Sequence, residues 1–195
     1  MDYQADRPAE LHDLMIQKHS GPEPQFDPVV REFLQQGYSD LKDHVLRGSL
    51  LQFASLGIRI PWLYRLTFST RGYTRDTDGE IRTADRHVVA LRFQPNYLRR
   101  ANRFEMLKLV EPSGTAFHPN ISPMGAICLE IYAGESVVEI CHSLHDLIRW
   151  RLRQYDESDA LNPIACAWGR DNIREPIDDR PLFGRGAAIQ WKQVQ

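Results

Sequence analysis

The sequence predicts an α+β domain with a long N-terminal helix, a four-stranded antiparallel meander sheet, a loop and a second long helix. An apolar stripe at helical spacing, bounded by Asp27 and Gly48, predicts the first helix. Alternation of apolar and polar residues predicts the strands, most clearly from 62 to 69. A capping pattern at Ser136 opens the second helix. Because the strands follow one another between two helices, we expect the α+β class.

The first helix is predicted to begin at Asp27 and Pro28. Aspartate caps free backbone N–H groups, and proline suits the first helical turn. The apolar stripe that follows is Val30, Phe33, Leu34, Leu41 and Val45. Gly37 weakens the middle of the helix by about 1 kcal/mol relative to alanine, so a break there is an alternative. Gly48 is the expected end, and residues 9–18 could form a separate short helix upstream.

Four strands are expected after this helix, at residues 50–56, 62–69, 87–93 and 104–110. The second shows the clearest alternation, with Trp62, Tyr64, Leu66 and Phe68 on one face. Asp78-Gly79 marks a turn within a long polar connection between the second and third strands. The sheet is therefore predicted to be a meander of sequential strands.

The second long helix has a well-defined start. Ser136 and Glu139 have the Ser-x-x-Glu spacing of a capping box. The apolar face that follows is Val137, Ile140, Cys141, Leu144 and Ile148. We expect the helix to run to Arg153, and we expect Cys141 to be a packed, unreactive thiol.

Two histidines on this helix allow two interpretations. His142 and His145 are three residues apart, so both could bind a metal ion from one face. No second pair of ligands with zinc spacing appears in the sequence. We therefore favour a solvated or helix-surface role for both.

Composition limits the classes of function. The chain has 195 residues and a formal net charge of −2, so no general attraction to nucleic acid or to a membrane surface is expected. No apolar run approaches the roughly 20 residues that span a bilayer, and no signal-peptide pattern opens the chain. Three cysteines without regular spacing argue against a disulfide framework. We expect a cytoplasmic protein that binds neither nucleic acid nor membranes.

One stretch carries the candidate chemistry: residues 117–129, Phe-His-Pro-Asn-Ile-Ser-Pro-Met-Gly-Ala-Ile-Cys-Leu. Its proline and glycine content disfavours a helix or a central strand, so Cys128 is predicted to lie on a loop. A thiolate is a strong nucleophile, and the thioester that it forms still reacts with amines and thiols. The alternative is a buried, inert cysteine beside a proline turn.

The spacing within this stretch resembles the active-site signature of ubiquitin-conjugating enzymes. The matching elements are His118-Pro119-Asn120, Gly125 and Ile127-Cys128-Leu129, with the same interval from asparagine to cysteine. The resemblance extends more loosely over residues 28–170. It implies the UBC-like fold, with an N-terminal helix, a four-stranded meander, an active-site loop and a central crossover helix. We therefore expect an N-terminal extension (1–26), a UBC-like catalytic domain (27–170) and a C-terminal tail (171–195).

The resemblance also implies an acyltransferase that needs no metal or organic cofactor. Cys128 would accept the C-terminus of a ubiquitin-like protein as a thioester from an activating enzyme. It would then pass this acyl group to an amine of a target protein. The N-terminal helix would dock the activating enzyme, and the exposed face of the second long helix would help to hold the ubiquitin-like protein.

Three further residues receive expected roles from the resemblance. Asn120, the motif asparagine, would stabilise a tetrahedral oxyanion or hold the shape of the loop, and the sequence favours neither. His118 is expected to form structural hydrogen bonds rather than to act as a general base. Asp159 is the best match for an acidic residue that orients the attacking amine or accepts its proton, ahead of Glu157 and Ser158. The alternative for this stretch is a solvated acidic loop.

The chain departs from the family pattern in two places. Residues 132–136 replace a common Trp-Ser-Pro element, and residues 97–102 replace the Tyr-Pro and Pro-Pro pairs before the fourth strand. This mixture, with the stretch 161–168, resembles divergent bacterial members of the family. Those proteins are encoded beside an activating enzyme, a ubiquitin-like protein and a peptidase, often in antiphage operons. The resemblance therefore implies a role in bacterial antiviral defence.

Two other functions remain as alternatives. One is a non-catalytic UBC-like module that binds ubiquitin-like proteins as an adaptor. Inactive variants of the family lack the cysteine, whereas this chain has Cys128, so we disfavour that interpretation. The other is an unrelated cysteine hydrolase, which requires a histidine held against Cys128.

Overall fold

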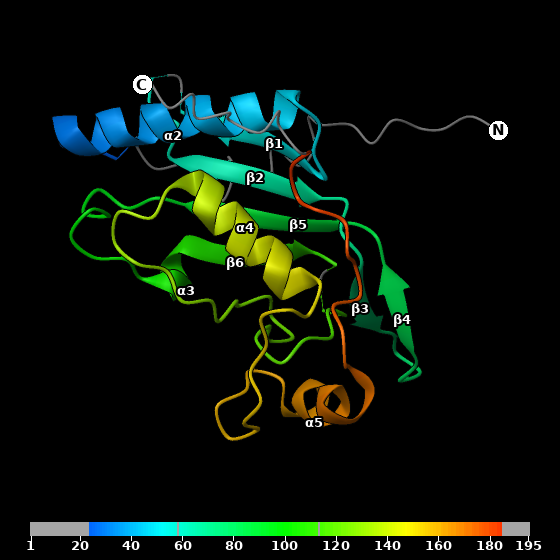
Figure 1. Cartoon of the computed structure of the whole chain (residues 1–195). Coiled ribbons are helices and arrows are strands. Elements are labelled where there is room, and N and C mark those ends of the chain that lie inside the picture. Colours follow the sequence, from blue (N-terminus) through cyan, green and yellow to red (C-terminus); the bar gives the residue numbers. More distant parts are fainter. Residues whose placement is uncertain (1–23, 58, 113, 185–195) are drawn as a thin grey trace, which may run out of the picture.

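The computed structural model describes residues 24–57, 59–112 and 114–184, and Figure 1 shows its architecture. Its main sheet is antiparallel, with the strand order β1-β2-β5-β6. The four strands are β1 (Leu51–Leu56), β2 (Leu63–Phe68), β5 (His87–Arg92) and β6 (Leu107–Glu111). The predicted meander is therefore confirmed. The short helix expected at residues 9–18 lies outside the described residues.

Two helices pack with this sheet (Figure 1). Helix α2 (Pro28–Leu46) begins as predicted, because the Asp27 side chain accepts a hydrogen bond from the Val29 N–H at 2.9 Å. Helix α4 (Val137–Ile148) crosses the sheet and begins with the predicted capping box. A Cβ atom on Gly37 would lie 3.3 Å from Val137 Cγ1, so glycine lets the two helices approach closely. Helix α2 continues through Gly37, and the alternative of a break there is wrong.

The core lies between the sheet and these helices. Alternate side chains of β2, namely Tyr64, Leu66 and Phe68, are fully buried, as period-two alternation predicts. The inner face of α4 packs in the same cluster and includes Cys141. Burial raises the pKa of the Cys141 thiol well above its usual range, so the thiol stays protonated. The prediction of a packed Cys141 is confirmed.

Two parts of the sheet region differ from the prediction. The polar connection after β2 forms a two-stranded hairpin, β3 (Gly72–Arg75) with β4 (Ile81–Ala84), around the predicted Asp78-Gly79 turn. The expected fourth strand begins instead with a short helix, α3 (Arg103–Met106), and only Leu107 starts the strand. Phe104 is therefore exposed on α3 rather than buried in the sheet.

Helix α4 ends at Ile148, and the predicted continuation to Arg153 is wrong. Trp150 has a φ of 67°, which breaks the helical geometry. Its ring is buried in a second apolar cluster with Phe117, Ala165 and Ile173. We attribute the early end to this burial, because a buried tryptophan contributes more stability than a strained φ costs.

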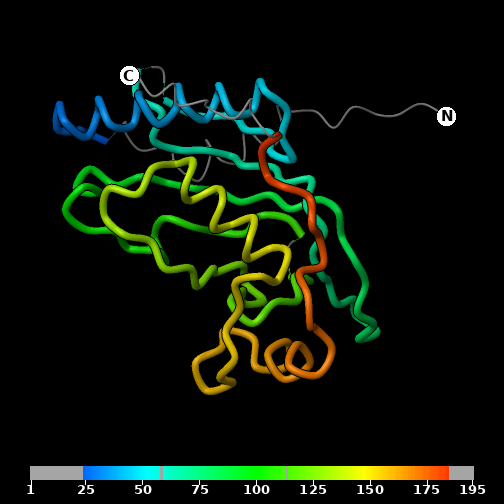
Figure 2. Tube along the Cα trace, viewed as in Figure 1, coloured from blue at the N-terminus to red at the C-terminus, as the bar shows by residue number. Residues whose placement is uncertain are grey.

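The chain after α4 closes the molecule. Helix α5 (Pro163–Asn172) extends beyond the expected short helix at 164–168. The following segment runs back toward the α2–β1 end of the sheet (Figure 2), where the Leu50 N–H donates to the Leu182 carbonyl at 2.8 Å. Leu182 and Phe183 are buried there, so the described part of the expected C-terminal tail contributes to the core. No helix within the described residues has both the length and the apolar character of a membrane span.

Candidate active site

The predicted loop around Cys128 forms a small hairpin attached to β6. Ile121 and Ile127 pair across it, and the Ser122 N–H donates to the Ala126 carbonyl at 2.9 Å. Gly125 occupies the turn with a φ of 82°, and a Cβ atom there would lie 2.4 Å from the Leu109 carbonyl oxygen. The Leu109 N–H in turn donates to the Gly125 carbonyl at 2.8 Å. Only glycine fits this contact, so the signature glycine fixes the hairpin against the sheet.

Cys128 is placed at the end of this hairpin with its side chain partly exposed. Its neighbours Ile127 and Leu129 are 0% and 6% exposed, so they anchor the backbone while the thiol lies on the other side. Within the described residues, no hydrogen-bond partner for the sulfur is present, and no histidine nitrogen bonds to it. Among the residues that the structure describes, the thiol is thus held on a fixed backbone without a bonded histidine, which a cysteine hydrolase needs.

Asn120 connects two segments of the site. Its side-chain amide donates to the Cys128 carbonyl at 2.9 Å, and its backbone carbonyl accepts the Cys128 N–H at 2.8 Å. Its side-chain oxygen accepts the Gln154 N–H at 2.7 Å. Both ends of the amide therefore hold backbone, and this geometry favours the loop-holding role over the oxyanion role.

His118 lies beneath this turn. Its Nδ1 accepts the Asn120 N–H at 3.0 Å, so its ring proton is assigned to Nε2. The ring is buried against Trp150, with centroids 4.8 Å apart. Burial, with a further contribution from the positive charge of Arg153, lowers the pKa of His118 to about 3. A neutral ring that supports the Asn120 backbone fits the expected structural role.

Asp159 lies on a loop that is attached to the motif turn at both ends. The Gln154 N–H bonds to Asn120, and the Asn162 N–H donates to the Pro119 carbonyl at 3.1 Å. Between these points, the Asp159 side chain is exposed and has no hydrogen bond or ion pair with any residue that the structure describes. The structure thus brings the loop of Asp159 next to the segment that carries Cys128.

Glu157 and Ser158, the less well placed candidates for the role of Asp159, already have hydrogen-bond or ion-pair partners. Glu157 forms an ion pair with Arg170. The Ser158 hydroxyl and backbone N–H both donate to Asp156 Oδ1, at 2.8 and 2.9 Å. These contacts shape the loop. Among the described residues, the Asp159 carboxylate has no hydrogen bond or ion pair.

The expected helix-surface role is wrong for His145. Its Nδ1 lies 2.9 Å from Thr70 Oγ1, and its Nε2 lies 3.1 Å from the Arg180 carbonyl oxygen. The chain after α5 covers this face of α4 and buries the ring, which no local sequence pattern reveals. His142 is exposed, as expected. No cluster of three or more potential metal-ligating side chains occurs among the described residues.

Because two histidines are buried, we expect the free energy of unfolding to fall in acid. Burial lowers the pKa of His87 to about 4 and that of His118 to about 3, below the value of about 6.5 in the unfolded chain. The unfolded state therefore binds more protons, and the free energy of unfolding falls as the pH drops from about 6.5 toward 4. We expect a loss of about 3 kcal/mol from His87 alone, measured by urea unfolding at pH 7 and pH 4. A His87→Gln variant should lose less, and equal losses would contradict this origin.

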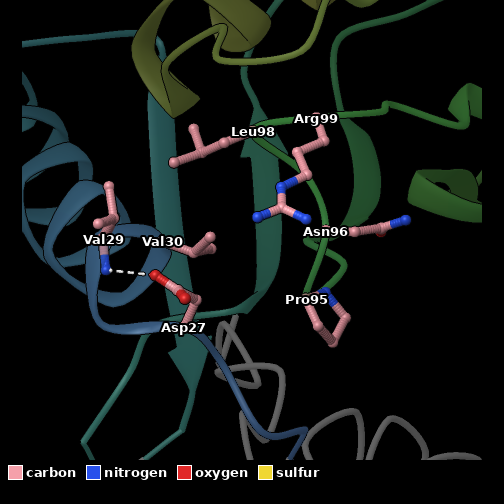
Figure 3. A pocket seen from close by; sticks show the side chains of 7 residues that line it. All are labelled: Asp27, Val29, Val30, Pro95, Asn96, Leu98 and Arg99. Atoms are coloured by element: carbon pink, nitrogen blue, oxygen red, sulfur yellow. Dashed lines mark hydrogen bonds between the residues drawn. The ribbon is translucent and has the colours of Figure 1, made fainter.

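A groove of about 480 Å³ lies where the start of α2 meets the loop after β5 (Figure 3). Val29, Val30 and Leu98 give it apolar walls, and the Arg99 side chain lines its other side. Val29 is 64% exposed although it is apolar. This end of α2 therefore presents the apolar Val29 side chain to solvent.

Sequence reasoning missed two residues that shape the site. Gln154 bonds to Asn120 through its backbone and accepts the Cys166 thiol through its carbonyl at 3.2 Å, and nothing in the sequence marks these contacts. Trp150 was expected inside a helix, yet it forms the platform for His118. The sequence signal for this position was a large aromatic side chain close to the predicted end of the helix.

Comparison with known proteins agrees with this fold. No protein-family model and no curated protein matches the sequence. Solved structures do match, including one described as a novel ubiquitin-conjugating enzyme, with a TM-score of 0.50 and 12% identity over 72% of this chain and 84% of that chain. Another is Ubc12 of S. cerevisiae, with a TM-score of 0.51 and 15% identity over 84% of this chain and 81% of that one. The chain has the UBC-like α+β fold.

Proposed function

We propose that the chain is a conjugating enzyme for a ubiquitin-like protein, with Cys128 as its nucleophile. The observation that carries the proposal is the setting of this thiol. It lies partly exposed on a hairpin that buried Ile127 and Leu129 hold against a sheet of UBC-like topology. A rigid backbone that offers one sulfur to solvent suits exchange with a thioester on another protein.

The proposed reaction has two steps. The Cys128 thiolate attacks the carbonyl carbon of a thioester on the activating enzyme, so a new C–S bond forms and the old one breaks, releasing the donor thiolate. An amine of the target then attacks the same carbonyl carbon. The C–N bond forms, the bond to Cys128 breaks, and the amine loses a proton. Neither step requires an oxidant or a reductant.

In this proposal Asp159 assists the second step. A lysine amine has a pKa of about 10.4, so it must lose a proton before or during attack. The unengaged carboxylate of Asp159, on a loop tied to Asn120 and Pro119, is available to orient the amine or to accept that proton.

An Asp159→Ala variant should load normally but discharge to free lysine about tenfold or more slowly. Single-turnover discharge of the preloaded protein measures this rate. Asp171→Ala, which removes an exposed carboxylate on α5, is the matched control and should keep the wild-type rate. Unchanged discharge in the Asp159 variant would exclude Asp159 from the mechanism.

Each proposed partner is expected to bind a different surface of the chain. The groove at the start of α2, with exposed Val29, is the proposed docking surface for the activating enzyme (Figure 3). The exposed side of α4, which includes Glu139 and His142, is proposed to contact the bound ubiquitin-like protein. We further propose a bacterial antiviral setting, which genes for these partners beside that of this chain would support.

The decisive experiment mixes the protein with the activating enzyme and ubiquitin-like protein encoded beside it, together with ATP. We expect an adduct whose mass equals the sum of the two proteins minus water, and which a thiol reductant removes. A chain that bound the ubiquitin-like protein but never formed this adduct would instead be the non-catalytic adaptor.

A further inference from the structure

The groove at the start of α2 lies beside the point where the described chain begins. Phe26 is 5% exposed and packs in the main core, so the chain is fixed three residues before the groove residue Val29. The groove has a volume of about 480 Å³, within the range of ligand sites, and Val29, Val30 and Leu98 form its apolar walls (Figure 3). Residues 1–23, which lie outside the described residues, therefore join the fold beside this groove.

The sequence before residue 24 contains a segment whose pattern suits this groove. The short helix expected at residues 9–18 would place Leu11, Leu14 and Met15 on one side, and Ile16 on the opposite side. An isolated helix of this length is marginal in water, so it needs an apolar surface to pack against. Binding of an amphipathic helix in an apolar groove is a common mode of recognition.

The connection between this segment and the fold is short. Eight residues of extended chain from Lys18 to Phe26 span at most about 28 Å, and residues 20–22, Ser-Gly-Pro, favour a turn between them. The segment can therefore fold back onto the start of α2. Because it is tethered beside the groove, its effective concentration there is on the order of millimolar.

Charge favours the same placement. Residues 1–23 carry five carboxylates and two basic side chains, so their formal charge is −3, whereas that of the whole chain is −2. In the groove, the exposed Arg99 guanidinium lies opposite Val29 (Figure 3) and forms no ion pair with any residue that the structure describes. The Asp27 carboxylate also lines the groove, but it accepts the Val29 N–H as the helix cap.

An adjoining groove extends the positive charge. It has a volume of about 340 Å³, shares two lining residues with the first groove, and is lined by Arg92, Arg100 and the hydrogen-bonded Glu105. In the expected helix, Glu10 and Asp13 are three residues apart and lie on the same flank of the apolar stripe. With the stripe in the first groove, these carboxylates would have complementary charges nearby.

We propose that residues 9–18 bind in the groove at the start of α2 and restrain the loading of Cys128 by competing with the activating enzyme. This inference rests on the proposed function, because that groove is the proposed docking surface of the activating enzyme. The apolar stripe contacts Val29 and its apolar neighbours, and the acidic flank pairs with Arg99. The activating enzyme binds only molecules whose groove is free, so its apparent affinity falls by that fraction.

Disulfide trapping tests the position of the segment without any partner protein. In the full chain with Cys128→Ser, the pair Leu14→Cys and Val29→Cys should form an intramolecular disulfide under oxidised glutathione, detected by intact mass. Ile16→Cys with Val29→Cys, from the opposite side of the expected helix, is the matched control. It should react about threefold to tenfold more slowly, because exchange requires access of one thiol to the other. Leu14→Cys with Leu46→Cys, at the far end of α2, should also react slowly.

A charge exchange tests the acidic flank. Adding Glu10→Arg and Asp13→Arg should slow the cross-link between positions 14 and 29 about threefold, and high salt should slow it in the chain with native charges. A further Arg99→Glu should restore part of the rate, because it recreates opposite charges. A rate that stayed the same in all three cases would exclude the pairing with Arg99.

The second measurement is the initial rate of thioester loading at a subsaturating concentration of the activating enzyme. Leu14→Asp in the otherwise native chain should load about threefold to tenfold faster, because the groove is free in more molecules. The gain should come from a lower KM for the activating enzyme, with kcat unchanged. Ile16→Asp is the matched control and should load at the wild-type rate.

The outcomes separate this inference from the proposed function. Equal cross-linking from positions 14 and 16 would overturn the docking of the segment, while normal thioester formation would leave the conjugating function intact. Loading that is no faster in Leu14→Asp would overturn the competition, and the groove would then serve the activating enzyme alone. Preferential cross-linking in a chain that never forms a thioester would support the docking but would overturn the conjugating function, and the competition with it.

Discussion

A Cys128→Ala variant should form no reductant-sensitive adduct with the ubiquitin-like protein. The side chain of Cys128 is the partly exposed thiol of the described residues, whereas those of Cys141 and Cys166 are buried. Burial raises the pKa of Cys141 and, with smaller charge effects, that of Cys166, so both thiols resist forming the reactive thiolate. The loss should therefore be complete rather than partial, as judged by non-reducing electrophoresis and intact mass.

The other cysteines supply the controls for this experiment. Cys141→Ala and Cys166→Ala should both retain the adduct, although Cys166→Ala removes the hydrogen bond to the Gln154 carbonyl. Cys128→Ser should replace the thioester by an oxygen ester, which a thiol reductant does not cleave but hydroxide does. An adduct that persisted in Cys128→Ala would move the nucleophile elsewhere and would refute the assignment of Cys128.

Elements with a strong local pattern could be predicted from the sequence. Asp27 and Ser136 marked the starts of α2 and α4, because capping depends on residues within one helical turn. The alternation in β2 placed Tyr64 in the core for a similar local reason. The loop position of Cys128 was predicted from the proline and glycine content of residues 117–129, which is also a local property.

Features that depend on distant segments could not be predicted. Helix α4 stops early because the Trp150 ring is buried with Phe117 and Ala165, residues from opposite sides of it in the sequence. His145 is buried by the segment that contains Arg180, which returns from α5. In each case tertiary burial outweighed a local preference for helix or solvent. The link from Asn120 to the loop of Asp159 is of the same kind, since a backbone N–H supplies it.

That link has a testable consequence for catalysis. The Asn120 side chain holds the Cys128 carbonyl through its N–H group and the Gln154 N–H through its oxygen. Removing it leaves two partly buried backbone groups without these partners, at a cost of about 1–3 kcal/mol for each group that stays unsatisfied. The hairpin of Cys128 and the loop of Asp159 would then no longer share a fixed contact.

We expect Asn120→Ala to slow discharge to lysine by about tenfold to a hundredfold, because small misplacement of reacting groups is costly. It should also lower the free energy of unfolding, measured with urea. Asn172→Ala, which removes an exposed asparagine at the end of α5, is the matched control and should change the discharge rate little.

Asn120→Asp separates the two roles that the sequence left open for this residue. The aspartate still accepts the Gln154 N–H, but it replaces the donor to the Cys128 carbonyl by a charged oxygen that repels it. If Asn120 mainly holds the Asp159 loop, the aspartate variant should retain more discharge activity than the alanine variant. If its N–H group stabilises the oxyanion, both variants should lose that activity, and the aspartate variant should lose more because of its charge. The geometry favours the first result, since the amide nitrogen already donates to a backbone carbonyl.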